Sequence, residues 1–205
     1  KIAKENAVAE TAFFIPAGDD FELRWFTPEI EMDLCGHATL ATAHALKTII
    51  QHPGNLFRFR SKSGLLEVSV AGRRYTLKFP SRKPVPADLP EQIGRSLDRM
   101  PVAVLKARDY VLVYNNEEDI REININRQIL DQINLDPGGV IITAPGRTCD
   151  FVSRFFTPQA SIFEDPVTGS AHCSLIPYWS ERLGKTEMTA MQLSERTGTL
   201  YCSDQ

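Results

Sequence analysis

The sequence has no long apolar run, no block of basic residues and few cysteines. None of its hydrophobic stretches approaches the roughly 18 residues that cross a bilayer. A formal net charge of −3, without a stripe of arginines and aromatics, argues against nucleic acid or an anionic membrane as the main partner. The four cysteines show no CxxC or other metal-ligand spacing, which favours reduced thiols over disulfides. The sequence therefore predicts a cytoplasmic protein whose partner is a small molecule.

Glycine-rich nucleotide-binding loops are absent as well. Neither a GxGxxG nor a Walker-type sequence occurs, so neither a dinucleotide nor ATP is indicated as a ligand. What the chain does contain is enough apolar material for a core, because 42% of its 205 residues are hydrophobic and 24% are charged. Two lobes of about 100 residues each fit this length.

An internal repeat supports two lobes. Three pairs of segments align in the same order: residues 1–18 with 129–146, RWFTP at 24–28 with RFFTP at 154–158, and CGHAT at 35–39 with TGSAH at 168–172. The repeat predicts two pseudo-symmetric halves with a single cleft between them. Glu10 falls opposite Gly138, so the second half lacks the acid that the first half has.

The predicted fold class is α+β, with a rolled, mostly antiparallel sheet around a central helix in each lobe. We expect the first lobe at residues 1–84 and a linker, a short helix and the second lobe at 85–205. The central helices are predicted at 36–51 and 169–183, and Pro177 inside the second should kink it or free a carbonyl. Compared with each other, the halves suggest that a leading strand and a closing strand lie outside the sequence.

The candidate chemistry lies where these two helices begin. Gly36 and Gly169 would leave the first backbone N–H groups uncovered, and these groups favour a carboxylate or an oxyanion. An ordinary N-cap at Thr168 or Ser170 is the alternative. Because the repeat pairs the two helix starts, we interpret both as parts of one anion-binding cleft.

Three titratable residues are candidates for proton transfer. Glu10 stands in an apolar stretch where a carboxylate is poorly solvated, as suits a general acid/base, although a solvent-facing glutamate at the start of a strand is an equal alternative. His37 and Asp165 could hold and relay protons, or could be a core histidine and a capping aspartate. His44 shares a helical face with His37, but no third ligand stands at metal spacing, so no metal site is predicted.

Four motifs together resemble the phenazine-biosynthesis PhzF-like isomerase family: ETAF at 10–13, RWFTP at 24–28, DLCGHAT at 33–39 and EDPVTGSAH at 164–172. The resemblance implies a fold similar to that of diaminopimelate epimerase, often as a homodimer, with the active site between two lobes and neither metal nor organic cofactor. It also implies that Glu10 is the proton-shuttling acid/base and that His37, Asp165 and Ser170 complete the catalytic site.

The related epimerases and racemases resemble one another in using two cysteines, one at each helix start. Here Cys35 occupies the first position and Thr168 the second, and a threonine hydroxyl has no thiolate-like state near neutral pH. We therefore predict a cofactor-independent isomerase that shifts a proton and a double bond within a small carboxylate-bearing metabolite. Glu10, His37, Asp165 and Ser170 would be catalytic, and Cys35, Gly36, Thr168 and Gly169 would bind the substrate. A two-base epimerase that uses Cys35, or a non-catalytic binder of small acids, remains an alternative.

Overall fold

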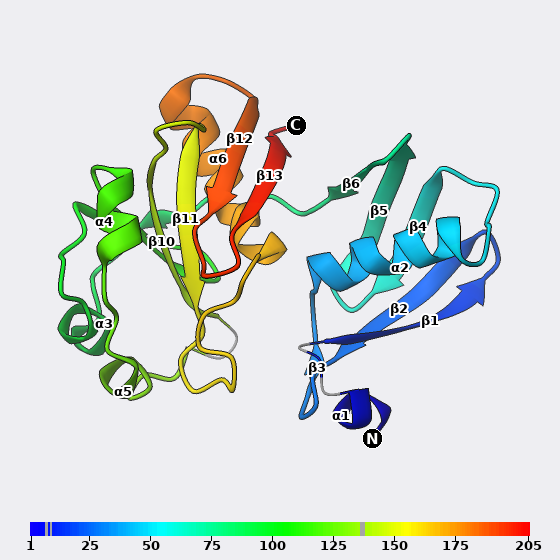
Figure 1. Ribbon diagram of the computed structural model, residues 1–205, viewed down its shortest axis with the longest axis horizontal. Coiled ribbons are helices and arrows are strands. Elements are labelled where there is room, and N and C mark those ends of the chain that lie inside the picture. The colour runs from blue at the N-terminus through cyan, green and yellow to red at the C-terminus, as the bar shows by residue number, and fades with distance from the viewer. Residues whose placement is uncertain (7, 9, 136–137) are drawn as a thin grey trace. The chain divides into compact units, whose positions relative to one another are not determined.

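A computed structural model describes residues 1–6, 8, 10–135 and 138–205, which divide into two compact units (Figure 1). Unit 1 is Lys1–Pro80 and unit 2 is Ser81–Gln205. Each unit has its own sheet, a long helix against that sheet and its own hydrophobic core. Within the described residues, no helix combines the length and the apolar character needed to cross a membrane.

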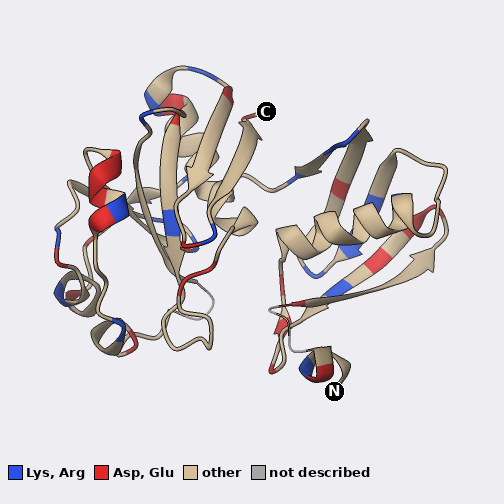
Figure 2. Cartoon of the chain, viewed as in Figure 1, with Lys and Arg blue, Asp and Glu red and all other residues tan. Residues whose placement is uncertain are grey.

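Unit 1 folds as a sheet with a helix across one face (Figure 1). Its elements are α1 (Ile2–Asn6), β1 (Thr11–Ala17), β2 (Asp20–Phe26), β3 (Glu31–Met32), α2 (Gly36–Thr48), β4 (Leu56–Ser61), β5 (Gly64–Ala71) and β6 (Arg74–Lys78). The strand order is β1-β2-β4-β5-β6, with β3 paired to β2. Alternation along β2 buries Phe21, Leu23 and Trp25 in one cluster with Ala38 and Leu46 of α2. Figure 2 shows α2 almost free of charge, and its buried side chains lie on the face that packs against the sheet.

Unit 2 has a seven-stranded sheet that is covered on both faces. Its elements are β7 (Val85–Pro86), α3 (Glu91–Ser96), β8 (Ala103–Lys106), β9 (Tyr110–Val113), α4 (Glu117–Glu122), α5 (Arg127–Leu130), β10 (Val140–Pro145), β11 (Phe151–Phe156), α6 (Gly169–Leu183), β12 (Glu187–Gln192) and β13 (Gly198–Ser203). Neighbouring residues of β10 enter opposite cores: Ile141 packs in the cluster of α6, and Ile142 packs in the cluster of α3, α4 and α5. The exposed side of α4 carries the acidic charges visible in Figure 2.

The two units share one strand-and-helix pattern, which confirms the predicted α+β fold. In unit 1, β1 and β2 are antiparallel, α2 connects β2 to a parallel β4, and β5 returns antiparallel. In unit 2, β10 and β11 are antiparallel, α6 connects β11 to a parallel β12, and β13 returns antiparallel. The repeat in the sequence is therefore a repeat of β–β–α–β–β units.

The two long helices end with different backbone conformations. Helix α6 runs from Gly169 to Leu183 as predicted, and Gly184 closes it in the left-handed region at φ 66°. Helix α2 ends at Thr48 rather than at the predicted Gln51. Gln51 itself adopts a left-handed φ of 59°, so the chain has already turned away from the helix axis there.

Pro177 frees a carbonyl, as the sequence predicted. A proline cannot donate to the carbonyl four residues earlier, which in α6 belongs to Cys173. That oxygen instead accepts a hydrogen bond from the backbone N–H of Arg82 at 2.8 Å. The first residues of unit 2 are thus fastened to α6 about one turn after its start.

Candidate active site

Helix α2 begins without a side-chain cap. Its N-cap residue, Cys35, is extended at φ −142° and ψ 103°, and its side chain makes no capping hydrogen bond. No acidic residue lies in the first turn. Thr39 instead donates its hydroxyl to the carbonyl of Cys35 at 2.6 Å, which fixes the backbone of the turn. The positive end of the helix dipole is thus left without an anionic partner from its own cap.

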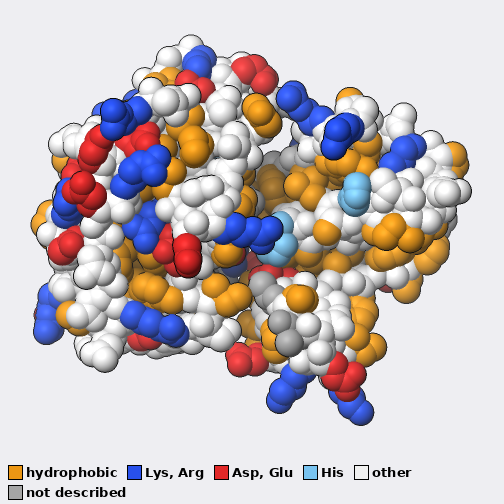
Figure 3. Space-filling view, in the orientation of Figure 1, with side chains coloured by type: hydrophobic (Ala, Val, Ile, Leu, Met, Phe, Trp, Pro, Cys, Tyr) orange, Lys and Arg blue, Asp and Glu red, His pale blue; other side chains and the backbone are white. Residues whose placement is uncertain are grey.

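Three side chains of unit 1 gather at this helix start. Glu10 directly precedes β1, and its Oε2 lies 3.0 Å from Nε2 of His37 in the first turn of α2. The thiol sulfur of Cys35 lies 3.7 Å from the same nitrogen and 3.9 Å from Nδ1. The Glu10 side chain is only 18% exposed, whereas that of His37 is 47% exposed. Histidine side chains reach the surface of unit 1 in Figure 3. A carboxylate, an imidazole and a thiol thus share one partly open site.

The neighbours of His37 favour its protonated form. Hydrogen bonding to Cys35 and to Glu10 raises the pKa of His37 to about 10, against an opposing effect of burial. An imidazolium donates from both ring nitrogens, so at neutral pH His37 is a cation beside Glu10. Such a pair can hold a negatively charged substrate and can return a proton to it.

The matching helix start in unit 2 is organised by Gln192. The hydroxyl of Thr168 donates to Oδ2 of Asp165 at 2.5 Å. Gln192 of β12, with no exposed surface, accepts from the Thr168 N–H at 2.7 Å and donates to the Asp165 carbonyl at 2.7 Å and to the Thr168 hydroxyl at 3.1 Å. Sequence reasoning missed Gln192. The available signal was a polar residue at an inward position of an alternating strand.

Replacing Gln192 with leucine is expected to destabilise unit 2 by about 1–3 kcal/mol, because the buried Thr168 N–H loses its acceptor. Denaturant unfolding measures this loss, and hydrogen exchange at the Thr168 amide should accelerate with it. Gln128→Leu is the matched control, since Gln128 lies exposed on α5. Equal stability of the two variants would show that Gln192 does not hold the turn.

His172 has a structural role that the repeat explains. It is 3% exposed, and its Nδ1 lies 2.8 Å from the carbonyl of Thr168. This contact matches the one from Thr39 to Cys35 at the equivalent position of α2. Burial lowers the pKa of His172, so the ring is neutral and donates from Nδ1. Gly169 and Ser170 stand, partly exposed, in the uncapped first turn.

The RWFTP segment at 24–28 and the RFFTP segment at 154–158 have the same construction. Arg24 binds both carboxylate oxygens of Glu31 at 2.7 and 2.8 Å, and Arg154 binds those of Glu164 at the same distances. Each guanidinium also lies over the phenylalanine two residues later, at 5.2 and 5.0 Å from the ring centre. These segments lead the chain from the sheet to the helix start in each unit.

The predicted site residues therefore form two groups. Glu10, Cys35 and His37 come together in unit 1, with Gly36 beginning the helix. Asp165 and Thr168 are joined in unit 2, where Gly169 and Ser170 follow. The first group belongs to unit 1 and the second group to unit 2. His44 contacts the Tyr75 hydroxyl at 3.1 Å, away from the other predicted residues.

Glu10, Cys35 and His37 also bear on metal binding. The sequence offered no third ligand beside His37 and His44, but Glu10 and Cys35 approach His37 from segments outside that spacing. One donor atom from each of the three residues lies within 4.8 Å of the others. A carboxylate, a thiol and an imidazole are the donor types that bind zinc.

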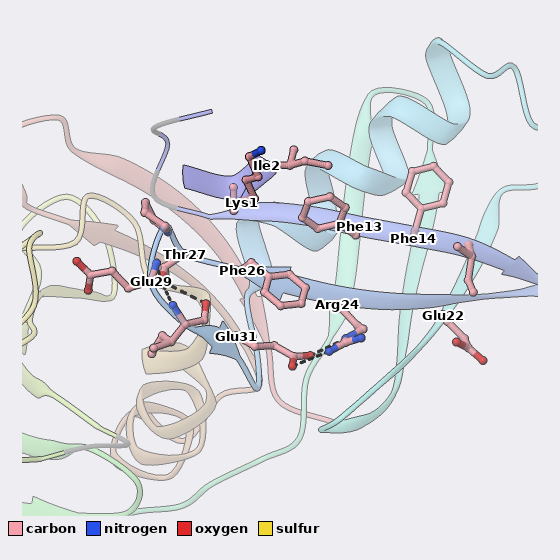
Figure 4. Close-up of a pocket in the computed structure, with 14 residues that line it drawn as sticks. Lys1, Ile2, Phe13, Phe14, Glu22, Arg24, Phe26, Thr27, Glu29 and Glu31 are labelled. Atoms are coloured by element: carbon pink, nitrogen blue, oxygen red, sulfur yellow. Dashed lines mark hydrogen bonds and ion pairs between the residues drawn. The ribbon is translucent and has the colours of Figure 1, made fainter. Parts of the chain in front are cut away.

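A hollow of about 690 Å³ lies elsewhere on unit 1 (Figure 4). Phe13 and Phe26 line it together with the Arg24–Glu31 ion pair and Ile2 of α1. Glu10, Cys35 and His37 are not among its lining residues. We place the candidate chemistry at the start of α2, because titratable groups converge there and the hollow contains a satisfied ion pair.

Comparison with known proteins agrees with these observations. The model of the family described as "Phenazine biosynthesis-like protein" matches residues 1–204. An uncharacterized isomerase of Pseudomonas aeruginosa is 46% identical over 202 residues, which cover 98% of this chain and 77% of the relative. A crystal structure of a PhzF-family phenazine biosynthesis protein from Enterococcus faecalis is 42% identical, with a TM-score of 0.92 over 100% of this chain and 78% of that one. A probable proline racemase of Agrobacterium radiobacter, at 10% identity and a TM-score of 0.58 over 93% of this chain and 66% of that one, is similar in fold alone.

Proposed function

The chain belongs to the phenazine biosynthesis-like family and has isomerase activity; from this premise we propose that it moves a proton within a small carboxylate-bearing metabolite, without a cofactor. The contact of 3.0 Å between Glu10 and His37 at an uncapped helix start carries the proposal. It joins an acid/base, a cation and free backbone donors in one place. Phenazine chemistry is not required by any of these residues.

In the proposed reaction, Glu10 takes a proton from a carbon of the substrate and returns it to another position on the same face. The proton leaves one carbon, the double bond shifts, and the second carbon receives the proton, so no oxidant or reductant is needed. Protonated His37 stabilises the negative charge that develops meanwhile. The N–H groups that begin at Gly36 bind the substrate carboxylate.

We further propose that the unit 2 group takes part in the same reaction. Asp165 accepts from Thr168, and Gln192 fixes both, so the carboxylate is held in a defined orientation. Ser170 adds a hydroxyl donor in the first turn of α6. These residues would orient the substrate, while Glu10 remains the group that exchanges protons with carbon.

Cys35 supports a second candidate, a two-base epimerase. Its thiol stands at a helix N-terminus, and its sulfur lies 3.7 Å from Nε2 of His37. Its counterpart in the repeat is Thr168, however, which already donates its proton to Asp165. A second thiol base is therefore missing at the paired position.

Cys35→Ala distinguishes the two candidates. A Glu10-centred isomerase should keep turnover within about tenfold of wild type, whereas a thiol-dependent epimerase loses its base and falls by at least about 10²-fold. Incorporation of solvent deuterium into a panel of small cyclic and amino acids measures proton abstraction before the product is known. Cys149→Ala is the control, because Cys149 lies in unit 2 outside both groups. Near-complete loss of exchange in folded Cys35→Ala would overturn the isomerase mechanism.

A further inference from the structure

We propose that Glu10, Cys35 and His37 also form a Zn²⁺ site, and that the ion bound there inhibits the isomerase. The inhibition rests on the proposed function, because Glu10 and His37 are the residues to which we assign proton transfer. The binding rests only on the three side chains. The ion is thus an inhibitor that competes for the acid/base group, not a cofactor of the reaction.

The donor set suits zinc and is close to complete. Structural and catalytic zinc sites use thiolate, imidazole and carboxylate ligands, and catalytic ones combine three protein ligands with one open position. Cys35 and Glu10 supply two groups that are anionic when bound, which together balance the charge of the ion. His37 supplies the neutral ligand and, at 47% exposure, leaves the site open to solvent.

The donor atoms lie at separations close to those around a tetrahedral ion. Zinc bonds of about 2.3 Å to sulfur and about 2.0 Å to nitrogen and oxygen place sulfur and nitrogen about 3.5 Å apart, and nitrogen and oxygen about 3.3 Å apart. The corresponding distances here are 3.7 Å from Cys35 to Nε2 and 3.0 Å from that nitrogen to Glu10. The sulfur also lies 3.9 Å from Nδ1, so the imidazole ring of His37 must turn for Nε2, the thiolate and Glu10 to surround one ion, with the fourth position open.

Capture of the ion would stop the proposed reaction directly. A zinc-bound Glu10 cannot take a proton from carbon, and a zinc-bound His37 can no longer donate from the same nitrogen. The ion would also stand in front of the N–H groups that bind the substrate carboxylate. Saturating zinc should therefore lower turnover by at least about tenfold, and removal of the ion by a chelator should restore it.

Binding is tested on the full chain after treatment with a chelator. Titration with Zn²⁺ against a fluorescent competitor should give one ion per chain, and Co²⁺ in its place should show thiolate charge-transfer absorption. Cys35→Ala should abolish that absorption and weaken zinc binding by at least about tenfold, since even outer-shell changes cost that much. Cys149→Ala and His44→Asn, at a partly exposed cysteine and an exposed histidine outside the cluster, should bind as wild type.

The outcomes separate this proposal from the proposed function. Zinc binding that survives Cys35→Ala, or that is lost in His44→Asn, overturns the site whatever the enzyme does. Binding as expected in a protein that never exchanges deuterium supports the site and overturns the isomerase. Binding with unchanged or increased turnover overturns the inhibition, because the acid/base would then act with the ion in place.

Discussion

Replacing Glu10 with glutamine is expected to lower turnover by at least about 10²-fold while the melting temperature barely moves. Glutamine keeps the size of the side chain and can still contact Nε2 of His37, but it cannot take or return a proton. Steady-state turnover and solvent deuterium exchange should therefore fall together. The pKa of His37, followed by NMR, should also fall, because Glu10 is one of the two groups that raise it.

Glu22→Gln is the control for this experiment. Glu22 is an exposed carboxylate on β2 of the same unit, and it lines the hollow rather than the helix start. Its replacement should change neither turnover nor the pKa of His37. If Glu10→Gln kept exchange near the wild-type rate, another group would have to be the base.

Arg154→Met is expected to destabilise unit 2 by about 3 kcal/mol, at the low end of the cost of removing one member of a buried ion pair. The Arg154 side chain is 16% exposed, and it binds Glu164 with two hydrogen bonds. It also donates to the carbonyls of Ile120 and Ile123 at 3.1 and 3.3 Å. Methionine would fill the space but leave a carboxylate and two carbonyls without their donor. Denaturant unfolding measures the difference.

The repeat provides a matched control for this change. Arg24 has the same two hydrogen bonds to Glu31 and the same contact with a phenylalanine, but its side chain is 60% exposed. Arg24 is open to solvent and Glu31 keeps a second partner, Lys62 at 2.7 Å, so Arg24→Met should leave the unfolding transition almost unchanged. Similar losses in both variants would contradict the view that burial sets the value of these ion pairs.

The fold was predictable where its signals are local or repeated. Glycine at each helix start, Gly184 at the end of α6 and the alternating pattern of β2 all act within a few residues, and the structure has the elements that they predict. The predicted end of α2 was wrong by a few residues, because Gln51 adopts a left-handed conformation that is uncommon for glutamine. The repeat predicted that the two halves share one pattern, whereas the order in which the strands pair came from the structure.

The candidate site was less predictable, because it depends on contacts between distant segments. The sequence named Glu10, Cys35 and His37, but it could not give the distances that make them one cluster with a donor set for metal. Gln192 was missed because it acts on Thr168 from another strand. His172 is close to the predicted residues in the sequence, yet its Nδ1–H donates to the backbone carbonyl of Thr168. Only the register of the strands and the burial of each side chain decide such roles.

The carbonyl that Pro177 releases sets where the chain becomes anchored in unit 2. Strand β6 ends at Lys78, and Arg82 donates its backbone N–H to Cys173 in α6, so only residues 79–81 lie between the last strand of unit 1 and the first anchored residue of unit 2. One of these residues, Pro80, has a fixed φ. Because Cys173 lies one turn after Gly169, the start of unit 2 is anchored to the same helix that carries the Thr168 turn.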